Sequence, residues 1–171
     1  MFAATLADDY VPPHIRASTP VEAVMPLLHD TKTREKLQTR LQALQPEATR
    51  QWGQMSADQM LRHLNMALSL SLGKTTLPPV KMPMPGPLFR FVVVNLPWPK
   101  NSPTHPGLSV LGERCDFASE KGRCLTLLEE FARKPMESAW PDSPLFGRVT
   151  GKFNSRLQAK HVDHHLKQFG A

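Results

Sequence analysis

Four separate segments of this sequence carry apolar residues every three or four positions, and no segment alternates apolar and polar residues as a half-buried strand would. The first segment, TKTREKLQTRLQAL, places Leu37, Leu41 and Leu44 on one helical face. With no strands available, such a face has to pack on other helices. We therefore expect a helix that begins at Thr31 and stops before Pro46.

The second segment has the clearest helix start in the sequence. Ser56 is the predicted N-cap, and Gln59 three positions later completes a capping box. Met55 and Met60 stand where the two residues of a hydrophobic staple belong. Gly73 stands where a helix commonly ends, because glycine readily adopts the left-handed conformation of a C-terminal cap. These signals predict a helix between Ser56 and Gly73.

Two further helices are expected in the C-terminal half. One begins near Cys115 or Asp116 and runs to about Arg133, with a proline shortly beyond its end. The other begins after Thr150, a favourable N-cap, and runs to Phe169. Four long amphipathic helices with one long connection are typical of an all-α four-helix bundle, which is the fold we expect.

The long connection spans residues 74–114, and nine prolines lie between Pro78 and Pro106. Its run PLFRFVVVNL predicts a short helix opened by Pro87, although the three valines also have strand propensity. Long irregular segments inside compact domains are commonly functional. Two hypotheses therefore stand: a lid over one end of the bundle, or a crossover that simply packs on the surface.

Length and composition fit one domain, with 171 residues of which 40% are hydrophobic and 21% charged. Residues 1–25 have weak periodicity and are interpreted as an N-terminal arm, which leaves residues 26–171 as the helical domain. The N-terminus lacks the basic region of a signal peptide, and no apolar run is long enough to span a bilayer. Cys115 and Cys124 form no disulfide framework. We expect a cytoplasmic protein without membrane association.

The net charge of +6 permits contact with anions but does not require it. No basic block is interleaved with aromatic residues, so no nucleic acid is expected as a partner. The sequence motifs of serine hydrolases, P-loop NTPases, Rossmann dinucleotide-binding proteins and zincin proteases are absent. These reaction classes are therefore without support.

Histidines are the residues that point to chemistry. One row of the last helix, at a spacing of four, reads Phe153, Leu157, His161, His165 and Phe169. Two imidazoles at positions i and i+4 can reach a single metal ion, as in helical zinc motifs. A metal site needs at least one more ligand, and His63 borders the apolar face of the second helix.

The alternative interpretation is that these histidines are hydrogen-bonded core residues without a metal. His164 points away from the other two and is interpreted as a surface residue or a partner of the ligands. The remaining histidines lie in predicted loops or in the arm and receive no role: His14, His29 and His105.

Several other side chains allow two interpretations each. Cys124 could be a soft metal ligand or a small buried thiol. Three glutamates of the third long helix could supply a general base or a carboxylate that hydrogen-bonds the metal ligands: Glu120, Glu129 and Glu130. The alternative is that all three are surface carboxylates. A basic row could steer an anionic substrate or be a solvated face: Lys152, Arg156 and Lys160. Asp163 and Lys167 have the spacing of a surface ion pair.

Four runs of the sequence resemble motifs of one family. They are WGQMS at 52–56 with the following Met60 and His63, KNSPT at 100–104, FGRVT at 146–150, and HVDHHLKQFG at 161–170. Together they are similar to a functionally uncharacterised family of the DinB-like (DinB/YfiT-type) superfamily of metal-binding four-helix bundles, from about residue 26 to the end. One departure is Gly151-Lys152-Phe153, where relatives tend to have an acidic and an aromatic residue.

The resemblance implies that His63, His161 and His165 hold a divalent metal ion. Imidazole ligation suits zinc, nickel, iron and copper alike, and we expect zinc, nickel or iron. Because the superfamily includes thiol-dependent transferases and isomerases, it also implies a metal-dependent enzyme with a small-molecule substrate and a thiol cofactor, and a homodimer. The alternative is a non-catalytic metal-binding or stress-related helical module. No catalytic or cofactor-binding residue can be named from the sequence.

Overall fold

The computed structural model describes residues 26–81, 84–102 and 104–171. Over these ranges the protein is all-α, as predicted, with five α-helices, one 3-10 helix and no strand. The elements are α1 (Thr31–Ala43), α2 (Ala57–Leu72), α3 (Gly86–Asn95), η1 (Pro106–Leu108), α4 (Phe117–Arg133) and α5 (Gly151–Gln168). The predicted arm at 1–25, with His14, lies outside the described residues. None of the described helices is both long and apolar enough to cross a membrane.

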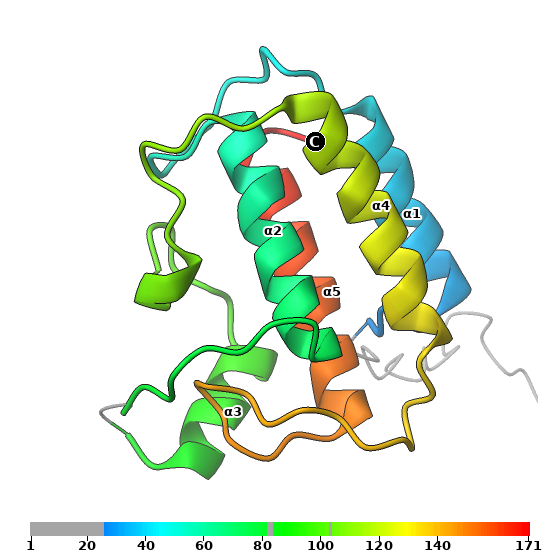
Figure 1. Cartoon of the computed structure of the whole chain (residues 1–171), viewed down its shortest axis with the longest axis vertical. Coiled ribbons are helices and arrows are strands. Elements are labelled where there is room, and N and C mark those ends of the chain that lie inside the picture. The colour runs from blue at the N-terminus through cyan, green and yellow to red at the C-terminus, as the bar shows by residue number, and fades with distance from the viewer. Residues whose placement is uncertain (1–25, 82–83, 103) are drawn as a thin grey trace, which may run out of the picture.

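Four of the helices lie alongside one another. α2 packs on α4 and α5, and α1 packs on the same two helices (Figure 1). The colour gradient in Figure 1 shows that α1 and α5 run in one direction and that α2 and α4 run in the other. Because α2 and α4 are parallel neighbours, the chain has to travel back along their length between them. Residues 74–114 make that return, which explains the long connection.

The predicted helix ends are found where the sequence places them. Ser56 and Gln59 form the capping box of α2, with the Ser56 amide donating to Gln59 Oε1 at 3.1 Å. Gly73 ends α2 in the left-handed region, at a φ of 78°. The Thr150 hydroxyl accepts from the Phe153 amide at 3.2 Å and so caps α5. These capping bonds satisfy amides that would otherwise lack partners, which is why local sequence predicts the ends well.

The core lies between α1, α2, α4 and α5. Its fully buried side chains include Leu41, Leu64, Leu128, Phe131 and Leu166. A second, smaller apolar cluster gathers around the start of α5, where Phe146 stacks on Phe89 of α3 with ring centroids 5.1 Å apart. This second cluster holds α3 against α5, so the predicted short helix forms despite its valines.

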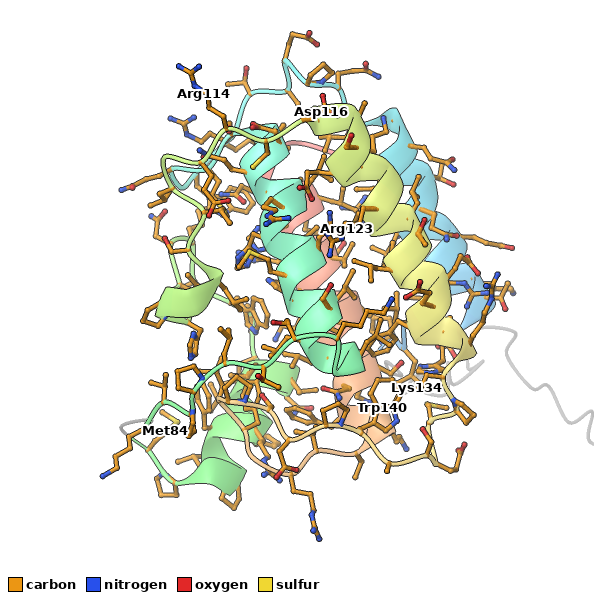
Figure 2. All side chains as sticks on the ribbon, in the orientation of Figure 1. Met84, Arg114, Asp116, Arg123, Lys134 and Trp140 are labelled. Carbon is orange, nitrogen blue, oxygen red and sulfur yellow. The ribbon has the colours of Figure 1, made fainter. Side chains whose placement is uncertain are left out.

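The segment between α4 and α5 packs closely against the start of α5. Trp140 lies below the end of α4 near Lys134, whose ammonium is 5.1 Å from the indole centroid (Figure 2). A side chain on Gly151 would overlap the Met136 carbonyl oxygen and lie 2.5 Å from Trp140 Nε1. The absence of a side chain at position 151 therefore has a steric reason in this chain.

Candidate metal centre

Three histidines converge between α2 and α5. His63 comes from α2, and His161 and His165 come from consecutive turns of α5. The Nε2 atom of His161 lies 3.1 Å from Nε2 of His63 and 3.1 Å from Nε2 of His165. His63 and His165 are buried and His161 is half-buried. The structure thus brings together the three residues singled out from the sequence, with ligand atoms within 4.8 Å of one another, close enough to bind one metal ion.

The tautomer of His63 is set by the 3-10 helix of the crossover. Its Nδ1 lies 2.9 Å from the carbonyl oxygen of Leu108. A carbonyl oxygen can only accept, so Nδ1 carries the hydrogen and donates it. In a neutral ring the other nitrogen, Nε2, then presents its lone pair toward the other two histidines.

The tautomer of His165 is set by Gln168. The Nε2 amide of Gln168 donates to the carbonyl oxygen of Trp52 at 2.8 Å, which orients the Gln168 side chain. Its Oε1 then accepts from His165 Nδ1 at 2.9 Å. As with His63, the Nε2 lone pair of His165 is left facing the cluster. Hydrogen bonds of this kind orient histidine ligands in metal sites.

All three rings are neutral at neutral pH. Burial lowers the pKa of His63, and it lowers the pKa of His161 to well below its usual value. Burial, reinforced by the neighbouring His63, lowers the pKa of His165 to about 3. Metals bind neutral imidazole, so the cluster needs no deprotonation before it can act as a ligand set.

The donor set fits a divalent metal ion. A hydrogen on His161 Nε2 can satisfy only one of the two lone pairs that face it, so one buried acceptor stays unpaired. A metal ion accepts all three lone pairs at once when the His161 hydrogen is on Nδ1. Imidazole nitrogens are suitable ligands for zinc, nickel, iron and copper alike.

Two cavities reach the cluster. The larger has a volume of about 370 Å³ and is lined in part by His63 and His161. The smaller, of about 290 Å³, is bordered by His63, His164 and His165. The crossover contributes Trp98, Ser102, Thr104 and Leu108 to the walls of both cavities. The crossover therefore does more than pack on the surface, since it forms part of the wall around the histidines.

Neighbouring aromatic rings enclose the cluster. Trp98 of the crossover lies 5.6 Å from the His161 ring and 5.4 Å from the His164 ring, measured between centroids. His164 is half-buried between Trp98 and Trp52 and is not one of the three converging residues. His164 therefore lies beside the three converging histidines and borders the smaller cavity.

The three glutamates proposed as partners or bases are engaged elsewhere. Glu120 accepts from Asn65 Nδ2 at 2.6 Å and pairs with Arg62 at 3.3 Å. Glu129 accepts from Gln38 at 2.6 Å, and Glu130 pairs with Lys74. Cys124 is fully buried in the core and is outside the histidine group, and burial raises the pKa of its thiol to about 12. The structure therefore supports the reading of Cys124 as a small core residue.

The residues of the basic row of α5 differ in exposure, since Lys152 is exposed whereas Arg156 and Lys160 are half-buried. Lys160 Nζ lies at the C-terminal end of α3 and donates to the carbonyl oxygens of Val93, at 2.6 Å, and of Leu96. A cation at this end of a helix is favourable, because the last carbonyls have no helical partner. Lys160 thus fastens the crossover to α5 and is not a free, solvated charge. The predicted pair of Lys167 with Asp163 forms at 2.7 Å.

Sequence reasoning missed two further histidine roles. His105, with 4% of its surface exposed, accepts from the Gly107 amide at 2.9 Å, and its Nε2 donates to the Pro78 carbonyl at 3.0 Å. His29 lies with Nδ1 2.8 Å from Ser155 Oγ and Nε2 2.8 Å from the Lys134 carbonyl oxygen. His105 therefore joins two parts of the crossover, whereas His29 ties the segment before α1 to α5 and to the end of α4.

Comparison of the chain with family models, with curated proteins and with solved structures finds no match. The function is therefore argued from the geometry of the histidines and of the cavities beside them.

Proposed function

We propose that this protein is a metal-dependent enzyme in which His63, His161 and His165 bind a divalent ion. The observation that carries the proposal is the convergence of three Nε2 atoms, two of them 3.1 Å from that of His161. The fixed tautomers of His63 and His165 support it, because both rings present a lone pair to the same point.

Three protein ligands leave a coordination position open for water or substrate, which is the usual arrangement of catalytic rather than structural sites. A divalent ion bound here would lower the pKa of a thiol or a water molecule at that position. The chain itself orients the imidazoles through Leu108 and Gln168, and Trp98 packs beside the His161 ring on the crossover side.

Two cavities that meet the histidines suit a reaction between two reactants. This supports the thiol-dependent transferase or isomerase expected from the resemblance, with a thiol cofactor and a small-molecule substrate. We further propose that α1, α2, α4 and α5 constitute a DinB-like four-helix bundle and that the protein is a homodimer, with zinc, nickel or iron as the metal.

A non-catalytic metal-binding module is the second candidate. It is favoured by the position of Glu120, Glu129 and Glu130, whose partners lie away from the histidines. In that case the ion would have a sensing or stabilising role, and no thiol or substrate would be turned over.

Elemental analysis of purified protein tests the proposal. We expect stoichiometric zinc, nickel or iron in the wild type after incubation with these metals, and its loss in His161→Ala. His164→Ala is the matched control, because it removes an adjacent imidazole of the same helix that is outside the converging group, and it is expected to keep the metal. Wild-type protein without stoichiometric metal, or equal metal in both variants, would overturn the proposal.

A further inference from the structure

The larger cavity has the size and lining of a small-molecule site. Its volume of about 370 Å³ lies within the range of about 300–1,000 Å³ that is common for ligand pockets. Its walls are predominantly apolar and come from α2, from the crossover with α3, from the segment before α5, and from α5 itself. They include Phe89, Val93, Trp98, Leu145, Phe146 and Leu157.

The cavity reaches from this apolar region to two of the converging histidines, His63 and His161. Apolar surface of this kind gains free energy when a nonpolar group displaces water from it. A molecule in the cavity would therefore bind through its hydrocarbon part and present its functional group to the histidines.

One amide stands out in the wall. Gln158 has 3% of its surface exposed, and its Nε2 lies 2.8 Å from the Ser71 hydroxyl. Its Oε1 is buried and has no hydrogen-bond partner among the described residues. A buried acceptor without a partner is unfavourable, and buried polar atoms are normally paired. The atom is closed to the cavity in this conformation, but Gln158 lines the cavity, and a rotation of its side chain toward it would let a donor group on a bound molecule supply the missing partner.

We propose that the larger cavity binds an apolar organic substrate, a hydrocarbon chain or ring carrying one hydrogen-bond donor for Gln158 and one metal-ligating group for the histidine end. The inference rests on the proposed metal site, and it adds the chemical class of the substrate. The predominantly apolar walls disfavour strongly hydrated molecules such as sugars and nucleotides.

Binding of alkyl hydroxamic acids to the zinc-loaded protein tests whether the apolar region of the larger cavity takes up a hydrocarbon chain. Their head groups chelate metal ions, and their tails can be lengthened from acetohydroxamic to octanohydroxamic acid. We expect affinity, measured by calorimetry, to rise about fourfold for each methylene that is buried. The variant Val93→Phe, which fills the cavity, is expected to abolish this rise, whereas Leu88→Phe on the exposed face of the same helix leaves it unchanged.

The outcomes separate the two proposals. Absence of bound zinc in the wild type contradicts the metal site itself. If zinc binds, two results contradict the apolar cavity and leave the metal site intact. One is a hydroxamate affinity that does not depend on tail length in the wild type, and the other is a hydroxamate affinity that still rises with tail length in Val93→Phe.

The role of Gln158 is tested with the ω-hydroxyl counterparts of the same acids and the variant Gln158→Leu. At the tail length that reaches the Gln158 amide, the ratio of hydroxyl to methyl affinities should be about two to ten times larger in the wild type than in Gln158→Leu. Zinc content and the melting temperature verify that the variant is folded. The same ratio of hydroxyl to methyl affinities in both proteins, at every tail length, would contradict the role of Gln158.

Discussion

Replacement of Gln168 by leucine removes the group that orients His165 without touching any proposed ligand. Gln168 is 3% exposed and joins two partners, accepting from His165 Nδ1 at 2.9 Å and donating to the Trp52 carbonyl at 2.8 Å. Leucine has a similar volume and can make neither bond. The change therefore isolates the hydrogen bonding behind the ligand from the ligand itself.

The expected losses of metal affinity and of folding stability follow from the two hydrogen bonds that Gln168→Leu removes. Loss of the partner of a metal-bound histidine typically lowers metal affinity about 10- to 100-fold, which corresponds to about 1.4–2.7 kcal/mol. The Trp52 carbonyl also loses its donor, and an unpaired buried group costs about 1–3 kcal/mol of folding stability. We expect Gln168→Leu to show both effects.

The assay is zinc competition against a chromophoric chelator, with urea denaturation of the metal-free protein alongside. Lys167→Leu is the matched control, because it introduces the same residue one position earlier and removes only an exposed ion pair with Asp163. Such pairs contribute little, so affinity and stability should stay close to those of the wild type. Wild-type zinc affinity in Gln168→Leu would refute the role of Gln168 in positioning His165.

Three further predictions concern other parts of the molecule. Because the pKa of His165 is about 3 in the folded protein, its ring takes up a proton below about pH 6.5 only in the unfolded chain, so His165 alone should lower the stability of the metal-free protein by up to about 1.4 kcal/mol per pH unit below that value. The lowered pKa values of His63 and His161 act in the same direction and add to this loss. Equal urea midpoints at pH 7 and at about pH 5 would contradict this. The thiol of Cys124, with a pKa of about 12 and no exposure, should resist iodoacetamide in the native protein while the partly exposed Cys115 is modified, as mapped by mass spectrometry. Gly151→Ala should destabilise the fold by about 1–3 kcal/mol because its methyl group meets backbone, whereas Gly122→Ala, which enters open space within α4, should be neutral or stabilising in the same thermal melt.

Much of the fold could be predicted because its signals are local. The capping box at Ser56, the C-terminal Gly73 and the cap at Thr150 act within one helical turn, so a linear sequence displays them directly. Helix α3 was harder to predict, because Val92–Val94 favour strands. Its contacts with α5 and the Lys160 ammonium at its end come from distant residues, and these outweigh local propensity.

The candidate site also combines residues that a local sequence signal predicts with residues that only the folded chain brings together. The spacing of His161 and His165 is a property of one helix, and this is why the pair could be predicted. Leu108 and Trp98 reach the histidines only through the path of the crossover, whose prolines remove the periodicity on which prediction depends. Gln168 stands three positions after His165 on the same helical face, so this partner did leave a signal in the sequence.

X-ray absorption spectroscopy of the zinc-loaded protein tests the central claim most directly. The three-histidine site predicts nitrogen or oxygen ligands at about 2.0–2.1 Å, with the scattering pattern of three imidazoles and one water oxygen. In protein prepared without added thiols, a sulfur shell at about 2.3 Å would require Cys115 or Cys124 and would contradict the site. A spectrum without imidazole scattering would contradict it equally.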